Sequence, residues 1–435
     1  MGQPTVELLD KPLDRLAVSE GASRTALRLG DGIFATRRET PSSVSELCAC
    51  VAQCAGENLG IYPQGGRTSL DFGGVPARPG LIINTLELSK VIDYPAADMT
   101  ITVESGMTLA ALQAILDKQN QYLPIDPPQS DQASLGGVMA TGWTGPRRFS
   151  AMRPRDQLIG IGFVNGLGTL IRGGGRVVKN VAGYDFPKLL TGSMGALGIL
   201  TELTFKVRPK PESTAIAWVP VRSAEEVGSF LDRLNLSATR PTALEVLNYP
   251  AANKIGSPLG LKPGDFVVAI GFDDTAKSIR WQCETILNEL PQGVSAEICH
   301  DSSARSVWHA LTENYAQTEA RLSVRIVTRP SRLAELLADI DSAVWNIQAH
   351  AGQGIATLST ELDRSLAAVE QDLARWASKV APLGGCVSLP ICPTGWKPHL
   401  KIWGDPKPDW SIMAGIKAAL DPNQILNPGR LIGLS

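Results

Sequence analysis

The order of hydrophobic and polar positions in the first third of the chain predicts short helices and strands in alternation. The stretch from Val44 to Leu59 has the apolar spacing of an amphipathic helix, with a serine at 42, 43 or 45 as N-cap and a glycine after it. The runs IYPQGG, LIINTLEL and MTITVESG predict strands. A second helix is predicted over TLAALQAILDKQ, beginning at a Thr108 cap.

A region rich in glycine and proline separates this part from the second half of the chain. Between Tyr122 and Arg176 the runs IGIGFVNG and GTLIRGG are strand-like, so we expect ordered loops around a ligand. The strand in LGILTELTFKVRPKPE runs into prolines, which places a domain boundary near Pro209–Pro211. We expect one domain over 1–210 with an N-terminal extension over 1–40, a second over 211–400, and a final segment over 401–435.

The second half predicts an α+β domain with an antiparallel sheet. The strand patterns TAIAWVPV, ALEVLN, FVVAIGFD, RLSVRIVT and GIATLS are separated by helical patterns such as SAEEVGSFLDRL and SRLAELLADID. A last helix, PDWSIMAGIKAAL, precedes the turn-forming sequence DPNQILNPGRL.

The composition of the chain argues against several classes of function. Basic and acidic residues nearly balance, at 41 and 43, and no segment concentrates Lys and Arg, so nucleic acid is not an expected partner. The N-terminus lacks the apolar core of a signal peptide or membrane span, which favours a cytoplasmic protein. The 7 cysteines include no Cys-x-x-Cys pair, so neither a disulfide framework nor an iron-sulfur site is expected, and Cys48, Cys50 and Cys54 fit small helix residues.

Three glycine-rich stretches carry the candidate chemistry: PQGGRTSL, SLGGVMATGWTG and NVAGYDFPKLLTGSMGALGILTE. Backbone amides approach an anion closely only where no Cβ intervenes, so such runs suit a pyrophosphate. Neither a phosphate-binding G-x-x-x-x-G-K-[ST] loop nor a G-x-G-x-x-G between strand and helix is present, which disfavours nicotinamide enzymes. Singly, each cluster is also compatible with a tight turn.

The order of these stretches resembles the FAD-binding domain of the vanillyl-alcohol-oxidase-type superfamily. Within it, GGRVVKNVAGYDFPKLLTGSMGALGILTELTFKVRP is similar to the E subunits of glycolate oxidase, and IKAALDPNQILNPGRL to the closing motif of FAD-linked 2-hydroxyacid oxidases. The resemblance is strong over 62–209 and weak in the middle of the second half. It implies a PCMH-type FAD-binding domain of two subdomains, followed by an α+β cap domain whose C-terminal segment returns to the flavin.

The resemblance also implies which residues hold FAD. Around the pyrophosphate these are Pro63, Gly65, Gly66, Arg67, Thr68, Ser69, Ser134, Leu135, Gly136, Gly137, Ala140 and Thr141. Around the adenosine and ring they are Lys179, Asn180, Val181, Ala182, Gly183, Tyr184, Asp185, Gly195, Gly198 and Ile199. From the C-terminus, Asn427, Gly429 and Arg430 would approach the flavin. Many relatives attach FAD to a histidine near the first loop, but the 4 histidines here lie at 300, 309, 350 and 399, which favours non-covalent FAD.

The substrate side departs from the pattern of the related catalytic subunits, H-x-G-D-G-N-x-H. Here the sequence is HAGQGIAT, with Gln353, Ile355 and Thr357 in place of the Asp, Asn and second His, so we expect no metal site. Met194 stands where those subunits have Glu, again as in the E subunits. His350 remains as a candidate catalytic base, against the alternative of a polar residue in a sheet.

Further candidates are His309 and the arginines at 321, 325 and 329. Arginine suits a bidentate grip on a carboxylate, but these arginines alternate along RLSVRIVTR as residues on one solvated strand face would. The resemblance implies an FAD-dependent oxidoreductase subunit that oxidises glycolate, and also D-lactate, with a catalytic FAD subunit and an iron-sulfur subunit as partners that could hold it near the inner membrane. The alternatives are a self-sufficient 2-hydroxyacid dehydrogenase and a catalytically silent scaffold.

Overall fold

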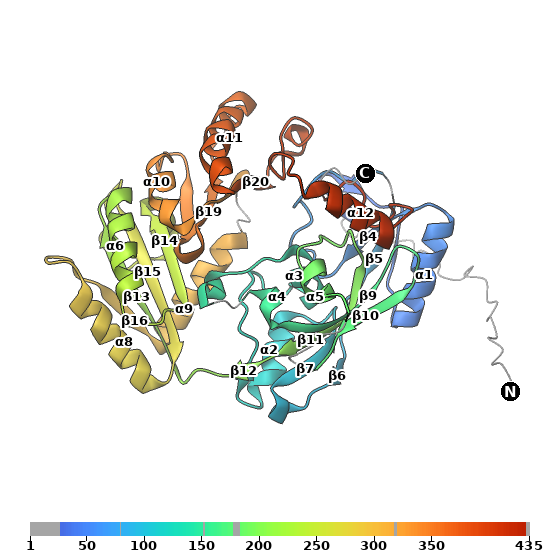
Figure 1. The fold of residues 1–435 in the computed structure, drawn as a ribbon, viewed down its shortest axis with the longest axis horizontal. Coiled ribbons are helices and arrows are strands. Elements are labelled where there is room, and N and C mark those ends of the chain that lie inside the picture. The colour runs from blue at the N-terminus through green and yellow to red at the C-terminus, as the bar shows by residue number, and fades with distance from the viewer. Residues whose placement is uncertain (1–26, 79, 151–152, 177–182, 317–319, 432–435) are drawn as a thin grey trace.

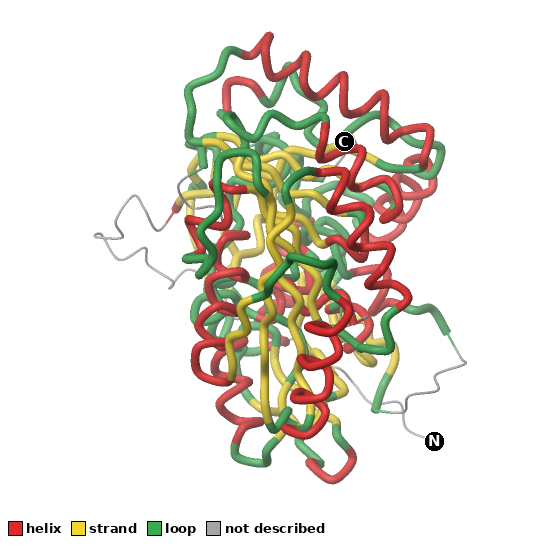
Figure 2. The backbone as a smooth tube through the Cα atoms, turned by 90° about the vertical axis from the view of Figure 1, so that its left-hand side faces the viewer, coloured by secondary structure: helices red, strands yellow, loops and turns green. Residues whose placement is uncertain are grey.

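The computed structural model describes residues 27–78, 80–150, 153–176, 183–316 and 320–431. The chain forms one lobe from its N-terminal half, crosses to a second lobe, and returns to the first with its C-terminal segment (Figure 1). Turned by 90°, strands run through the middle of the molecule with helices on either side (Figure 2). No helix within the described ranges is long and apolar enough to cross a membrane.

A small parallel sheet of order β3-β5-β4 opens the first lobe. Its strands are Arg37–Glu39, Gly80–Asn84 and Gly60–Gln64, and the hairpin of β1 (Arg28–Gly30) and β2 (Ile33–Phe34) lies before it. Helix α1 (Val44–Gly56) is capped by Ser43, which accepts from the Glu46 N–H, and it ends earlier than Leu59. Because β3 pairs with β5, residues 37–39 belong to the sheet and not to an extension outside it.

The rest of the first lobe is an antiparallel sheet of order β10-β9-β11-β7-β6. In that order the strands span Leu170–Gly174, Leu158–Val164, Ile199–Lys206, Thr100–Glu104 and Val91–Asp93. The helices are α2 (Leu109–Asp117), α3 (Leu135–Thr141), α4 (Pro154–Gln157) and α5 (Phe186–Leu190). Thr108 caps α2 as predicted. The short strands β8 (Gln121–Tyr122) and β12 (Arg208–Pro209) pair where the chain leaves the lobe.

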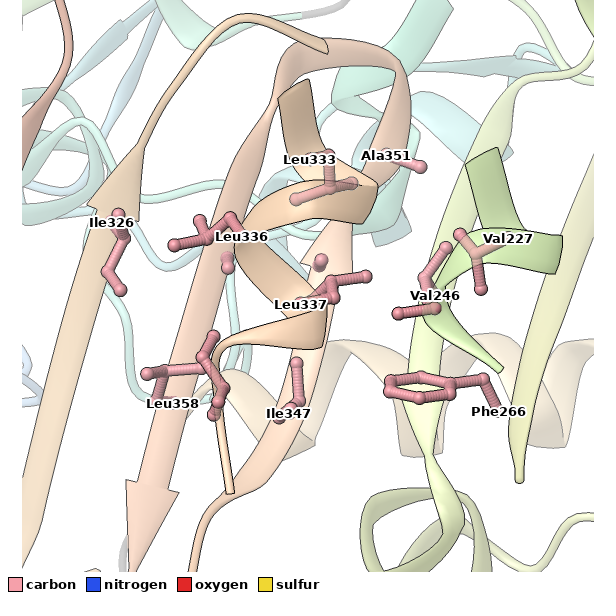
Figure 3. Close-up of a cluster of buried hydrophobic side chains, with 14 of the residues drawn as sticks. Val227, Val246, Phe266, Ile326, Leu333, Leu336, Leu337, Ile347, Ala351 and Leu358 are labelled. Carbon is pink, nitrogen blue, oxygen red and sulfur yellow. The ribbon is translucent and has the colours of Figure 1, made fainter. Parts of the chain in front are cut away.

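The second lobe is built on an eight-stranded antiparallel sheet, which confirms the predicted α+β cap. Its order is β16 (Glu297–His300), β13 (Ser213–Val221), β15 (Phe266–Asp274), β14 (Ala243–Asn248), β18 (Asn346–His350), β19 (Ile355–Thr360), β17 (Leu322–Val327) and β20 (Cys386–Ile391). One face packs on α6 (Ala224–Leu236), α8 (Ala276–Glu289), α10 (Leu333–Ala338) and α11 (Leu366–Val380). Figure 3 shows this core, where Leu336 and Leu337 of α10 lie over Ile347 and Leu358.

The other face is covered only in part, by α7 (Tyr249–Ile255) and α9 (Asp301–Glu313) over strands β13 to β15. Strands covered on both faces carry apolar side chains at nearly every position, which explains the run in β13. Toward β18, β19, β17 and β20 this second face bears polar side chains, described below.

The C-terminal segment joins the first lobe through helix α12 (Trp410–Leu420) and the turn after it. The Ile61 N–H donates to Ile425 O at 2.7 Å, and the Asn427 N–H donates to Ile61 O at 2.7 Å. Ile425 and Leu426 are fully buried in the core below α1. Residues 425–430 therefore pack beside strand β4, directly before the first glycine-rich loop.

Candidate functional site

The loop after β4 turns tightly because two glycines press against the chain that leads into α3. A Cβ atom at Gly65 would lie 1.9 Å from Ser134 Oγ, and one at Gly66 would lie 1.7 Å from Gln132 O. Within the described part of the chain, four N–H groups of this loop donate to no acceptor: those of Gly65, Gly66, Thr68 and Ser69. Unpaired amides gathered in one turn form the kind of concavity that binds an anion.

Helix α3 forms the second wall. The Ser134 side chain caps it by accepting from the Gly137 N–H at 3.2 Å, and the Gly136 N–H donates to Ser105 O at 2.7 Å. A Cβ atom on Gly137 would meet only Ser134 Oγ, at 3.1 Å. The glycine surface of α3 is therefore open toward the loop rather than filled by the protein's own atoms.

The third wall combines the segment 194–199 with the C-terminal turn. The Met194 N–H donates to Ala140 O at 2.8 Å, which ties this segment to α3. The Asn427 side-chain amide donates to Met194 O, which ties it to the C-terminus. Gly195, at φ +70°, holds a backbone conformation that glycine favours.

These walls line one open hollow. The predicted residues that line it are Pro63, Gly65, Gly66, Arg67, Thr68, Ser69, Ser134, Gly136, Gly137, Ala140, Thr141, Gly195, Gly198, Ile199, Asn427 and Arg430. Residues that the sequence did not single out for this site include Tyr62, Thr85, Ser105 and Met194. Segments from both ends of the chain therefore meet at one site.

Other predicted residues lie elsewhere. Leu135 is fully buried in the core of the lobe, and Gly429 packs against the backbone at Val75, so neither lines the hollow. Gly183, Tyr184 and Asp185 are exposed and do not line the hollow, and Asp185 caps α5; their contact with the adenosine and ring stays a prediction. Lys179, Asn180, Val181 and Ala182 lie outside the described residues.

Arg430 lines the hollow, but its guanidinium is already engaged. It pairs with Asp31 at 2.8 Å and donates to Leu29 O at 2.7 Å and Gly74 O at 2.8 Å. Arg430 therefore lines the hollow while its guanidinium joins the two ends of the chain.

A second hollow continues from the first and lies between the lobes. The two share Arg67, Thr68, Ser69, Leu70, Phe72 and Thr141. Trp143 of the first lobe lines it together with Tyr315 and Pro390 of the second. A ligand seated on the glycine-rich loop could thus extend to the face of the cap sheet.

Behind Tyr315 lies a buried polar cluster centred on Glu245 of β14. His350 Nδ1 lies 2.6 Å from Glu245 Oε1, and the Tyr315 hydroxyl and the Gln348 amide donate to Glu245 Oε2 at 2.7 and 3.0 Å. Tyr315 and His350 also stack, with ring centroids 4.6 Å apart. With Nδ1–H donating to the carboxylate, His350 Nε2 keeps its lone pair, and it bonds to no described residue.

Burial dominates the acid–base properties of this cluster. It lowers the pKa of His350, against the opposing effect of Glu245, and so favours the neutral imidazole. Burial and then Glu245 raise the pKa of Tyr315 well above its usual value, so its hydroxyl stays protonated. His350 is therefore a buried imidazole of the sheet, held by a carboxylate, whose neutral form is favoured.

Comparison with known proteins agrees with this geometry. The family described as "FAD binding domain" matches residues 38–174, and that described as "FAD linked oxidases, C-terminal domain" matches residues 210–388 and 405–431. The chain belongs to the FAD-linked oxidase family. As an FAD-linked oxidase it is an oxidoreductase with FAD as its cofactor.

Curated relatives of this FAD-linked oxidase include glycolate oxidase subunit GlcD of Bacillus subtilis, 28% identical over 97% of this chain and 93% of the relative. D-2-hydroxyglutarate dehydrogenase of Xanthomonas citri pv. viticola is 29% identical over 90% of this chain and 88% of the relative. Glycolate oxidase subunit GlcE of Escherichia coli is 40% identical, but over 28% of this chain and 36% of the relative. A solved alkyldihydroxyacetonephosphate synthase shares the fold, with a TM-score of 0.66, 17% identity, and coverage of 91% of this chain and 77% of the other.

The three arginines of β17 and its ends do not form the solvated face that their alternation predicts. Arg321 and Arg329 are exposed, whereas Arg325 is half-buried and its guanidinium lies 5.5 Å from the centroid of the Trp143 ring. The prediction was wrong for Arg325, because the first lobe covers that part of the sheet. His309 on α9 is exposed and away from the cluster.

The HAGQGIAT segment holds the lobes together and carries His350. Gln353 donates to Arg148 O at 2.6 Å, while Ile355 and Thr357 are buried in β19. Within the described ranges, no three His, Cys, Asp or Glu side chains gather as ligands for a metal ion. In this FAD-linked oxidase, the position where related catalytic subunits have their second histidine is occupied by a buried threonine.

Proposed function

We propose that this chain is the FAD-binding E-type subunit of a glycolate oxidase complex, oxidising glycolate or D-lactate to the 2-oxoacid. The observation that carries the proposal is the continuity of the two hollows. One end offers unpaired amides to an anion, and the other reaches Tyr315, behind which the carboxylate-held His350 is buried. A flavin and a small hydroxyacid need these two environments side by side.

FAD fits the first hollow by the chemistry of its walls. The pyrophosphate would lie against the amides of 65–69 and the bare surface of Gly137, where an added side chain would occupy its place. No His or Cys side chain of the described residues lines either hollow, which supports non-covalent attachment. The two family matches support the division into an FAD domain over 1–210, a cap over 211–400 and a returning segment over 401–435.

Oxidation of a 2-hydroxyacid removes a hydride from the carbinol carbon and a proton from the hydroxyl. Bound FAD would accept the hydride. His350 is the group of this chain suited to take the proton, because its Nε2 is free and its Nδ1 is held by Glu245. Three of the relatives are named for glycolate oxidase, D-2-hydroxyglutarate dehydrogenase and D-lactate dehydrogenase, which supports this class of substrate.

Assignment to the E-type subunit rests on local features. Identity with GlcE rises to 40% where the two align, and Met194, Gln353 and Ile355 replace residues that the related catalytic subunits carry. We therefore infer a second FAD subunit and an iron-sulfur chain as partners, as the names of the relatives suggest for a multi-subunit enzyme. The full-length similarity to GlcD favours a second candidate, a self-sufficient dehydrogenase.

The visible spectrum of the purified chain, recorded without oxygen before and after adding glycolate, tests these alternatives. We expect flavin bands that persist in the isolated chain and bleach when the partner subunits are present. Bleaching of the chain alone would establish the self-sufficient dehydrogenase instead. If the isolated chain showed no flavin bands and its complex still oxidised glycolate, only the hypothesis of a catalytically silent scaffold would remain. Acid precipitation should release the FAD into the supernatant, whereas a yellow pellet would contradict non-covalent binding.

A further inference from the structure

The register of the cap sheet places a row of polar side chains on the face that looks toward the first lobe. Glu245 pairs with His350, and Gln348 pairs with Thr357, which in turn pairs with Arg325. Residues directly opposite each other share a face, and so do residues two apart on one strand. The opposite face, with Val324 and Ile326, belongs to the core under α10 and α11. The polar row therefore faces the first lobe, whose Trp143 ring lies 5.5 Å from the Arg325 guanidinium.

Arg325 in this row meets a second arginine, Arg148, which comes from the first lobe. Arg148 lies in the 3-10 turn Pro146–Ser150, and its backbone carbonyl is held by the Gln353 side chain, three residues after His350. The charge of Arg325 adds to burial in lowering the pKa of Arg148 to about 10, and both arginines act on Tyr315 and His350. Arg148 of the first lobe is thus anchored, through Gln353, beside the polar row that carries Arg325 and His350.

Neither guanidinium has an acidic partner among the described residues. Arg148 and Arg325 form no ion pair there, whereas the adjacent Arg147 pairs with Asp273 at 2.8 Å. Arg148 Nε is buried without a hydrogen bond, and so is the hydroxyl of Ser323, two residues before Arg325 on the same face. Half-buried cations and buried donors without partners are costly unless a ligand satisfies them.

We propose that Arg148 and Arg325 together bind the carboxylate of a small 2-hydroxy monocarboxylate, between the lobes and beside His350. The inference rests on the proposed function and deepens it by naming the residues that select the substrate. Guanidinium groups bind carboxylates through paired N–H donors, and one from each lobe would close the lobes around the ligand. The hydroxyl on the next carbon would then lie within reach of the His350 side of the cleft.

The charge count favours one carboxylate over two. Arg148 and Arg325 bring two positive charges, and Glu245 brings one negative charge that three donors already satisfy. The cluster therefore has one positive charge to neutralise, which a monocarboxylate does and a dicarboxylate exceeds. The site should prefer glycolate and D-lactate to malate.

Binding of these acids to the FAD-loaded full chain, or to its complex, tests the site directly. Titration without oxygen, followed by the shift of the visible flavin bands, gives a dissociation constant without turnover. Arg148→Met and Arg325→Met should each weaken glycolate binding by at least about tenfold, since each removes a charge-assisted bond. Arg321→Met, just before the same strand, is the matched control, because its side chain is exposed and, among the described residues, pairs with Asp363 alone. Retained FAD absorbance shows that each variant folds.

The outcomes separate this inference from the proposed function. Wild-type affinity for glycolate in both folded arginine variants would overturn the inference and leave the function standing. The protein could instead bind malate or inorganic phosphate, in a way that depends on both arginines, and fail to bind glycolate or D-lactate. That result would support an anion site but overturn its assignment to a monocarboxylate. A wild-type protein that binds none of these anions would overturn both.

Discussion

Replacing Asp31 with asparagine should destabilise the first lobe far more than the same change at a neighbouring aspartate. Asp31 is 7% exposed and its carboxylate bridges Lys397 at 2.7 Å and Arg430 at 2.8 Å, both nearly fully buried. An amide keeps the shape but leaves both cations without a counter-charge. Breaking a buried pair in this way costs about 3–5 kcal/mol. Asp71, whose side chain is 45% exposed, pairs with an equally exposed Arg28 and accepts the Asp31 N–H at 2.8 Å, a bond that an amide oxygen keeps, so Asp71→Asn should cost about 1 kcal/mol.

Urea denaturation followed by tryptophan fluorescence measures both costs, because Trp403 donates to Arg430 O beside the cluster. The Asp31 cluster also holds the backbone at Gly73, to which Lys397 donates at 2.8 Å. We therefore expect Asp31→Asn to weaken FAD binding as well, measured by the flavin lost on gel filtration. Equal unfolding midpoints for the variants at 31 and 71 would refute the assignment of a buried, mutually dependent charge cluster.

Three further predictions follow from single sites. Gly137→Val should weaken FAD binding by at least about tenfold in equilibrium dialysis, because the added side chain enters the hollow. Its control is Gly415→Val, which should leave the FAD content unchanged, because a Cβ added at this helical glycine would meet no neighbouring atom within 4 Å. Lys417→Met should cost about 3–5 kcal/mol in urea denaturation, since it leaves Asp421 buried and unpaired. Burial lowers the pKa of His350, so as pH falls below about 6.5 the imidazole becomes protonated in the unfolded chain before it does in the folded chain. The free energy of unfolding of the wild type, relative to that of His350→Asn, should therefore decrease as pH falls below about 6.5. A difference that does not change with pH would contradict this prediction.

Local signals in the sequence were sufficient for the glycine-rich loops and for several helix starts. Thr108 caps α2 as predicted. The loop at Gly65 and Gly66 can be recognised from the sequence because only glycine fits so close to the neighbouring chain. Glu245 could not be found in this way. It is a single acid in the apolar run ALEVLN, and it meets His350 only through the register of β14 with β18.

Long-range packing also determines the surroundings of two arginines, Arg325 and Arg430. Alternation along β17 correctly put Arg325 on a polar face, but which lobe covers that face depends on the whole fold. Arg430 lies near the glycine-rich loop as predicted, yet its charge is taken by Asp31, a residue 399 positions away in sequence. Partners of buried charges are thus the part of a site that sequence patterns reveal least.

The distribution of paired and unpaired buried charges distinguishes structure from function in this protein. Inside a lobe, each buried lysine of the described residues has an anion, since Lys397 has Asp31 and Lys417 has Asp421. Between the lobes, Arg147 likewise has Asp273. Arg148 and Arg325 have no such anion among the described residues, although they come together from the two lobes. Half-buried guanidiniums without a counter-charge, one of them with a buried Nε that has no partner, are explained by an anion that comes from outside the chain.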